Sequence, residues 1–287
     1  MNEFVIMTDT GCDIAPDILQ KWNVALIDLT LNTEDGQTLP LSSLPVSEFY
    51  SQMRAGKTFR TAAANLGDYL SRFEPVLQAG QDLLYLSFSG SLSNTVNTAR
   101  MAANELMEAY PGRQAVILDS VCASGGLGLL LFFAVQKRDA GASLSETEAY
   151  LRQHTPKLCH WFTVDNLAYL KRGGRIGAVA AGLGTVLNLK PVLHMDDAGA
   201  LTNVQKVRGR KQAVKALAER YSLLSEDPAC GVYFISHGDC MEEAQRLEAL
   251  IRETHGNSAA LITDIGPVIG SHSGPGTLAL FFLGKQR

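Results

Sequence analysis

The chain has 287 residues, 46% hydrophobic and 19% charged, which is enough to bury a substantial core or to form two lobes. A formal net charge of −4 without a long basic block disfavours binding to nucleic acid. The longest apolar run, Leu127–Val135, is about half of what a bilayer crossing requires, so stable membrane insertion is not expected. An acidic residue and a strand-like run at the start argue against a signal peptide, and five cysteines without a CxxC pair favour reduced thiols in a cytoplasmic protein.

Short apolar runs alternate with helical patterns in the first half of the chain. The pattern predicts strands at 4–7, 24–31, 83–88 and 115–119, and helices at 15–22, 95–109 and 122–136. This alternation predicts a parallel sheet covered by helices on both faces. The segment 122–136 is apolar almost all round, as is typical of a helix buried between layers. Ser145 to Glu148 fits a capping box that begins a further surface helix.

The second half of the chain has a different pattern. Strands are expected at 160–164, 189–195, 201–207, 231–236, 259–263 and 278–282, and the second and third of these flank a hairpin connection. A mixed sheet with helices follows from this order. We therefore expect an α/β protein of two lobes, residues 1–156 and 157–287, with the boundary at Thr155-Pro156.

Three loops rich in small polar residues follow predicted strands, where ligands of open parallel sheets bind. The loop 89–94 is the most informative, because Ser93 or Asn94 lies at the expected N-terminus of the helix that starts at Thr95. The first amides of a helix lack intrahelical partners and favour an anion such as a carboxylate or phosphate. The alternative is that Ser93 only caps the helix.

Several catalytic and cofactor motifs are not found. The sequence contains no GxxxxGK[ST], HExxH or GxSxG pattern, and the glycines at 173–177 do not follow a strand, so neither a nucleotide fingerprint nor a metal site is predicted. Residue types alone leave open a serine hydrolase that acts on acyl esters through Ser93, with His272 as its base. The stretch 265–276 contains four glycines and two prolines, which predicts an irregular, defined path with His272 at its centre.

The sequence resembles the DegV family over about residues 3–283, because it contains a set of short motifs in the same order. The matching residues are Thr8-Asp9-Thr10 with Asp13, Leu92-Ser93-Asn94-Thr95, Asp119-Ser120 with Gly125 and Gly128, Leu170 with Gly173-Gly174-Arg175-Ile176, Lys190-Pro191, Lys206-Val207-Arg208-Gly209, and Ile265-Gly266-Pro267 with His272-Ser273-Gly274-Pro275-Gly276.

The resemblance implies a two-lobed fold, with an N-terminal parallel sheet, a second lobe with a mixed sheet, and a tunnel for a long-chain fatty acid such as palmitate or oleate. It implies a bacterial, non-catalytic lipid-binding protein without a cofactor or metal. The protein would present its ligand to an ATP-dependent fatty acid kinase that supplies phospholipid metabolism. The fatty-acid-binding residues implied are Thr61, Ser93, Asn94, Thr95 and His272. The family's basic positions near the pocket mouth match Arg175 and Arg208, which would contact the head group or the partner.

Two positions depart from the family pattern. Ala62 follows Thr61 where the family has serine, and Asn94 replaces a glycine, so the head-group geometry is expected to differ. Candidate tunnel walls are Leu127–Val135, Gly177–Leu187 and Leu278–Phe282. Burial of an acyl chain gains about 0.8 kcal/mol per CH₂, or roughly 11 kcal/mol for about fourteen methylenes before the cost of association. The tunnel would therefore supply most of the affinity, while hydroxyls and amides offset the desolvation of the carboxylate.

Overall fold

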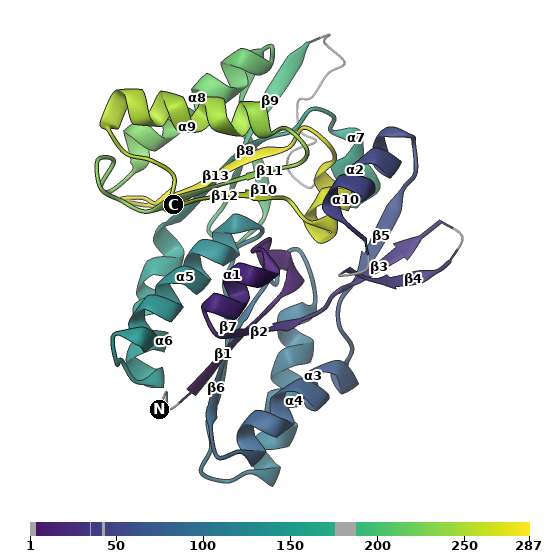
Figure 1. The fold of residues 1–287 in the computed structure, drawn as a ribbon, viewed down its shortest axis with the longest axis vertical. Helices are drawn as coiled ribbons and strands as arrows, with labels where there is room; N and C mark the ends of the chain where they lie inside the picture. The colour runs from purple at the N-terminus through teal and green to yellow at the C-terminus, as the bar shows by residue number, and fades with distance from the viewer. Residues whose placement is uncertain (1–3, 35, 42–43, 176–187) are drawn as a thin grey trace.

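The computed structural model describes residues 4–34, 36–41, 44–175 and 188–287. Three sheets and the helices packed on them build a mixed α/β molecule that is elongated along its vertical axis in Figure 1. This architecture confirms the predicted fold class. Within the described ranges, no helix is both long and apolar enough to cross a bilayer.

The first sheet is parallel throughout and lies in the lower half of Figure 1. Its strands, in order, are β2 (Val24–Ile27), β1 (Phe4–Asp9), β6 (Asp82–Ser87) and β7 (Ala115–Asp119). One face packs against α3 (Leu66–Gln78) and α4 (Thr95–Ala109), and the other against α1 (Pro16–Lys21), α5 (Gly125–Asp139) and α6 (Leu144–His154). Both faces are therefore covered, which agrees with the nearly continuous apolar run of β6.

The second sheet is mixed, and all of its strands come from residues 158–283. In order they are β10 (Leu201–Arg208), β9 (Leu189–Met195), β8 (Leu158–Thr163), β13 (Leu278–Leu283), β11 (Tyr233–His237) and β12 (Leu261–Asp264). The predicted hairpin between β9 and β10 is confirmed by antiparallel pairing of Met195 with Leu201. On this sheet pack α8 (Arg210–Leu224) and α9 (Met241–His255), both visible at the top of Figure 1.

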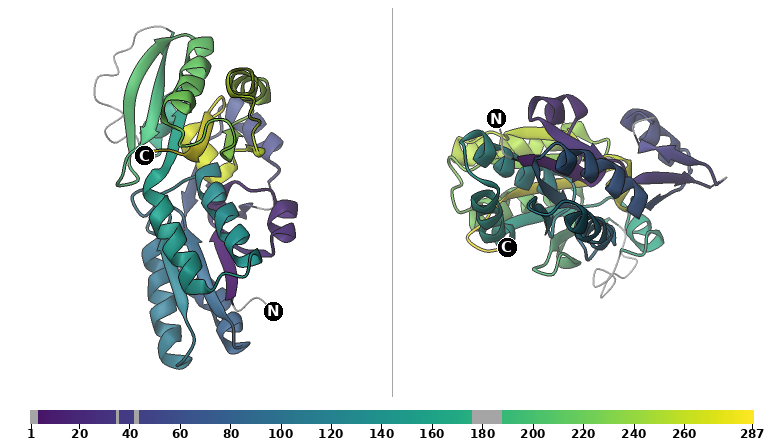
Figure 2. Two further views of the ribbon diagram at one scale, coloured as in Figure 1. Left: turned by 90° about the vertical axis from the view of Figure 1, so that its left-hand side faces the viewer. Right: turned by 90° about the horizontal axis from the view of Figure 1, so that it is seen from below.

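A third, small antiparallel sheet projects from the flank of the molecule, as Figure 1 and the right-hand view of Figure 2 show. It contains β4 (Thr38–Pro40), β3 (Thr30–Thr33) and β5 (Phe59–Ala62), with α2 (Val46–Arg54) between β4 and β5. The single strand predicted over 24–31 is therefore wrong. The run is split at exposed Asp28, and its two halves pair in different sheets.

Helix α5 connects the two large sheets. It contacts β1 and β6 on one side, and β8, β11 and β13 on the other. Its residues Leu127, Leu129, Leu130 and Leu131 are completely buried, as the all-round apolar pattern of this segment predicts.

Two local predictions need correction. The capping box of α6 is formed by Ser143 and Glu146, two residues before the predicted pair. The segment 265–276 is not irregular throughout, because Pro267–Ser273 form the helix α10, with Pro267 at its first position and Gly266 as N-cap. His272 therefore lies in the last turn of a helix. The described residues also form the short helix α7 (Ala168–Arg172) and the 3₁₀ segments η1 (Thr10–Cys12) and η3 (Thr155–Lys157), the second of which follows α6.

Candidate functional site

A largely apolar pocket lies where the ends of the two large sheets meet the small sheet and α10. Its walls include Phe88 after β6, Phe162 on β8, Met195 on β9, Ile269 on α10 and Phe281 on β13. The space between its wall atoms is about 940 Å³ with open solvent included, and the cavity that admits a water-sized molecule is about 130 Å³, below the roughly 300–1,000 Å³ of small-molecule sites. Its mostly apolar lining suits the hydrophobic part of a ligand.

Polar side chains gather at one part of this pocket. Thr61 on β5, Ser93 before α4 and His272 on α10 all line it, and Thr61 Oγ1 lies 2.8 Å from His272 Nε2. The three side chains are half-buried, whereas the apolar wall at Phe88 and Phe281 is buried. The polar end of the pocket is thus the end nearer to solvent. Three residues predicted from distant parts of the sequence therefore share one pocket.

His272 is held as a neutral imidazole. Burial, helped by the charge of Arg175, lowers the pKa of His272 to about 4. Its Nδ1 atom is buried without a hydrogen-bond partner among the described residues. The ring fits because residue 173 is glycine, since a Cβ there would lie 2.2 Å from Nδ1. Gly173 at the end of α7 is therefore a site residue that sequence reasoning noted only as part of a motif.

The hydroxyl of Ser93 is directed toward Thr95, two residues further along the chain. Ser93 Oγ lies 2.7 Å from Thr95 Oγ1 and accepts a long hydrogen bond of 3.4 Å from the Thr95 amide. Thr95 is completely buried and does not line the pocket, so it supports Ser93 from behind. Asn94 is exposed, does not line the pocket, and uses its side-chain oxygen to accept a bond from Asn97 Nδ2. Direct ligand contact therefore fits Ser93 but not the other two residues of this loop.

The two predicted arginines lie in different places. Arg175 lines the pocket, is exposed, and donates to the Leu92 carbonyl from Nε at 3.3 Å and from Nη2 at 3.1 Å. Arg208 is exposed on β10 opposite Leu189 and does not line the pocket. Only Arg175 is thus placed beside the polar end.

The predicted tunnel walls are only partly those of the pocket. Ala279 and Phe281 of the segment 278–282 line it, but none of Leu127–Val135 does, because those side chains fill the core between the sheets. The Gly/Ala-rich segment 177–187 lies outside the described residues. The residues just before α5, Ala123 and its N-cap Ser124, line the pocket instead.

A buried histidine, which the sequence pattern did not single out, contributes to the wall. His160 on β8 is 2% exposed, and burial, together with the charge of Arg287, lowers its pKa well below the usual value. Its Nε2 accepts a 3.5 Å bond from the Ala123 amide, and Nδ1 faces the Leu158 carbonyl at 3.1 Å. A Cβ on Gly126 would lie 2.1 Å from Nε2, so glycine is required there. A strand position within an apolar run gives no signal of this role.

Asp13 joins the elements that carry the pocket. Its Oδ2 accepts a 2.6 Å bond from Ser124 Oγ at the start of α5, and its Oδ1 accepts a 2.9 Å bond from the Gly266 amide at the start of α10. Burial raises the pKa of Asp13 to about 7, although these two bonds lower it. This carboxyl thus ties the start of α5 to the helix that carries His272.

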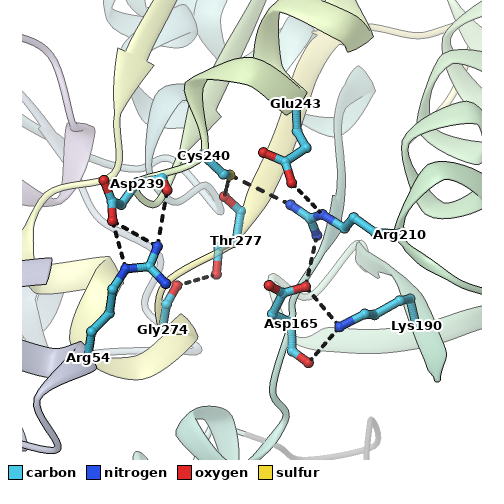
Figure 3. A network of polar contacts seen from close by, with 9 residues as sticks. All are labelled: Arg54, Asp165, Lys190, Arg210, Asp239, Cys240, Glu243, Gly274 and Thr277. Atoms are coloured by element: carbon cyan, nitrogen blue, oxygen red, sulfur yellow. Dashed lines mark hydrogen bonds and ion pairs between the residues drawn. The ribbon is translucent and has the colours of Figure 1, made fainter. Parts of the chain in front are cut away.

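A second polar network holds the chain that follows α10 (Figure 3). Asp165 forms an ion pair of 2.8 Å with Lys190 and one of 3.7 Å with Arg210. Gly276 packs against this carboxylate, where a Cβ would lie 2.4 Å from Asp165 Oδ2. The C-terminal side of α10 is therefore fixed by charges that lie outside the pocket.

The geometry favours binding over hydrolysis. His272 Nε2 is paired with Thr61, and Ser93 Oγ forms its hydrogen bonds with two atoms of Thr95, so Ser93 and His272 do not form a nucleophile–base pair. Among the described residues no cluster of three or more His, Cys, Asp or Glu side chains is suited to a metal ion. The site offers hydroxyl donors beside an apolar cavity, which is the chemistry that an amphipathic acid requires.

Comparison with known proteins gives a consistent result over the whole chain. The model of a family described as "Uncharacterised protein, DegV family" matches residues 3–285. A DegV domain-containing protein of Clostridium perfringens is 39% identical over 289 residues, covering 100% of this chain and 99% of the relative.

Similar solved structures also belong to the DegV family. A DegV family protein of Thermus thermophilus, described by its fatty acid binding, is 28% identical with a TM-score of 0.88 and covers 98% of this chain and 99% of its own. A DegV lipid-binding protein of Thermotoga maritima is 26% identical with a TM-score of 0.85 and covers 99% of both chains. The chain belongs to the DegV family.

Proposed function

We propose that this protein binds one long-chain fatty acid, with the acyl chain in the apolar pocket and the carboxylate at Thr61 and Ser93. The observation that carries the proposal is the meeting of both hydroxyls with His272 at the more exposed end of an otherwise apolar cavity. The fatty acid binding described for the Thermus thermophilus relative supports the ligand class. Affinity comes mainly from burial of the methylenes, and the hydroxyls keep the carboxylate hydrogen-bonded.

The protein acts in this proposal as a carrier and not as an enzyme. The carboxylate is held at the solvent-facing end, so an ATP-dependent fatty acid kinase can transfer a phosphoryl group to it and form an acyl phosphate while the acyl chain stays buried. The exposed Arg175 beside the polar end supports a contact with the head group or with that partner. Palmitate and oleate are the ligands that we expect.

Native mass spectrometry of the purified protein tests the proposal. We expect one bound fatty acid per chain, and uptake of added palmitate or oleate by the delipidated protein. Thr61→Ala with Ser93→Ala removes two hydroxyls worth about 0.5–1.5 kcal/mol each, so Kd should rise by about 5- to 150-fold.

The matched control removes a threonine and a serine hydroxyl remote from the pocket. Thr254→Ala with Ser222→Ala deletes hydroxyls that bond helix carbonyls in α9 and α8, and should leave Kd unchanged. Absence of bound lipid together with failure to take up either acid would reject the proposal.

A further inference from the structure

The pocket extends along strand β13, which follows the helix that carries His272. Thr277 lies beside the end of this helix, because its hydroxyl donates to the Gly274 carbonyl at 2.8 Å. Thr277, Ala279 and Phe281 all line the pocket, two residues apart along the chain. At about 3.3 Å per residue, Phe281 lies roughly 7 Å beyond Ala279 on the strand. Phe281 therefore marks the part of the pocket that is remote from the polar side chains.

Four residues that line the pocket form one row across the second sheet at this depth. They are Leu201 on β10, Met195 on β9, His160 on β8 and Phe281 on β13. Leu201 pairs with Met195, and His160 pairs with Phe281. The register of β8 with β9 places Met195 opposite His160, so the four side chains lie next to one another. None of the described residues beyond this row on β8 or β13 lines the pocket.

The two rings of this row are held firmly from behind by the first residues of α5. A Cβ on Gly125 would lie 3.0 Å from Phe281 Cε2, and one on Gly126 would lie 2.1 Å from His160 Nε2. The rings also pack edge to face, with centroids 5.2 Å apart and an interplanar angle of 85°. Because a packed interior leaves no space behind them, the rings form a rigid wall.

We propose that this row, here called the end stop, sets the longest acyl chain that the pocket accepts. The inference rests on the proposed function, in which the carboxylate lies at Thr61 and Ser93, so the terminal methyl group points toward the end stop. A chain that is too long must either displace the packed rings or pull its carboxylate away from the two hydroxyls. Both changes cost binding free energy.

The end stop predicts a break in the dependence of Kd on chain length. For acids that end before the stop, each added methylene is buried, and Kd should fall by about fourfold per methylene. Once the terminal methyl group touches the row, a further methylene gains no burial. Kd should then stop falling or rise, and the chain length at which this happens is the break length.

Two substitutions in the end stop should move the break to longer acids. Met195→Ala removes the side chain beyond Cβ at a buried position and opens space for about two further methylenes. Phe281→Leu replaces the ring by a smaller apolar side chain and opens space for about one. The second variant keeps the test decisive if the first does not fold, and thermal unfolding shows which variants are folded.

Each substitution has a matched control that makes the same change away from the pocket. Met53→Ala alters a similarly buried methionine on α2 that does not line the pocket. Phe282→Leu alters the residue next to Phe281 on β13, whose side chain faces the opposite side of the sheet. The ring of Phe282 packs there against Tyr221 of α8, with centroids 5.1 Å apart. Both controls should keep the wild-type break length.

Displacement of a fluorescent fatty acid by saturated acids from laurate to arachidate, odd-numbered chains included, gives Kd for each length. A break in the wild-type protein that moves to longer acids in a folded end-stop variant, but not in its control, supports the inference. A Kd that keeps falling up to arachidate in the wild-type protein, or a break that stays in place in every folded end-stop variant, would overturn it. Failure of the wild-type protein to bind any of the acids would instead reject the proposed function.

Discussion

Substitution of Gly173 by alanine tests whether the placement of His272 matters for the ligand. Gly173 has a helical backbone with φ −71° and ψ −5°, so alanine is allowed there and only space opposes it. The new Cβ would lie 2.2 Å from His272 Nδ1, and an ordinary contact begins at 3.4 Å. The ring must therefore move by about 1.2 Å, which breaks its 2.8 Å hydrogen bond with Thr61. Loss of one such bond costs about 0.5–1.5 kcal/mol, or a roughly 2- to 13-fold rise in Kd.

Displacement of a fluorescent fatty acid gives Kd, and thermal unfolding of the same samples shows that the fold is retained. Gly67→Ala in α3 is the control, because its Cβ would meet only Asn65 Oδ1, at 3.2 Å. It should leave Kd unchanged. Wild-type affinity of Gly173→Ala for palmitate would show that the position of His272 does not affect binding.

Three further substitutions test the packing around His160, the raised pKa of Asp13 and the contribution of a surface ion pair to stability. Gly126→Ala would place a Cβ 2.1 Å from His160 Nε2, and this overpacking should lower the free energy of unfolding in urea by about 1–3 kcal/mol; an unchanged midpoint would contradict it. Burial raises the pKa of Asp13 from 3.8 to about 7, so the native state binds more protons between these values and stability falls as pH rises through them. Asp13→Asn should make this fall smaller between pH 5 and 7.5, and an equal fall would refute the assignment. Arg54→Ala removes an ion pair of 2.7 Å with Asp239 in which both side chains are about half exposed, so the free energy of unfolding should change by less than about 1 kcal/mol; a larger loss would show that this contact between distant segments holds the fold.

The alternation of strands and helices predicted the parallel sheet, because buried parallel strands such as β6 are continuous apolar runs. Reliance on continuous apolar runs also explains why residues 24–31 were wrongly predicted to form a single strand. A continuous apolar run does not reveal that the chain leaves one sheet and enters another at Asp28. The predicted capping box lies two residues after the observed one, because Ser143 with Glu146 and Ser145 with Glu148 fit the sequence pattern equally well.

The site depends on contacts that are distant in sequence. Thr61 and His272 are separated by 211 positions, and no spacing rule connects them. Ser93 could be singled out locally, because it lies where a helix starts after a buried strand. Thr61 was indicated only by the family resemblance. Asp13 and Gly173 belonged to recognised motifs, but their roles depend on the tertiary positions of α5 and α10.

A crystal structure of the protein with palmitate tests the central claim most directly. We predict acyl density along the wall formed by Phe88, Phe162 and Phe281, with carboxylate oxygens at about 2.5–3.0 Å from Thr61 Oγ1 and Ser93 Oγ. A pocket without lipid density at saturating palmitate, or an acid bound with its carboxylate at the apolar end, would contradict the claim.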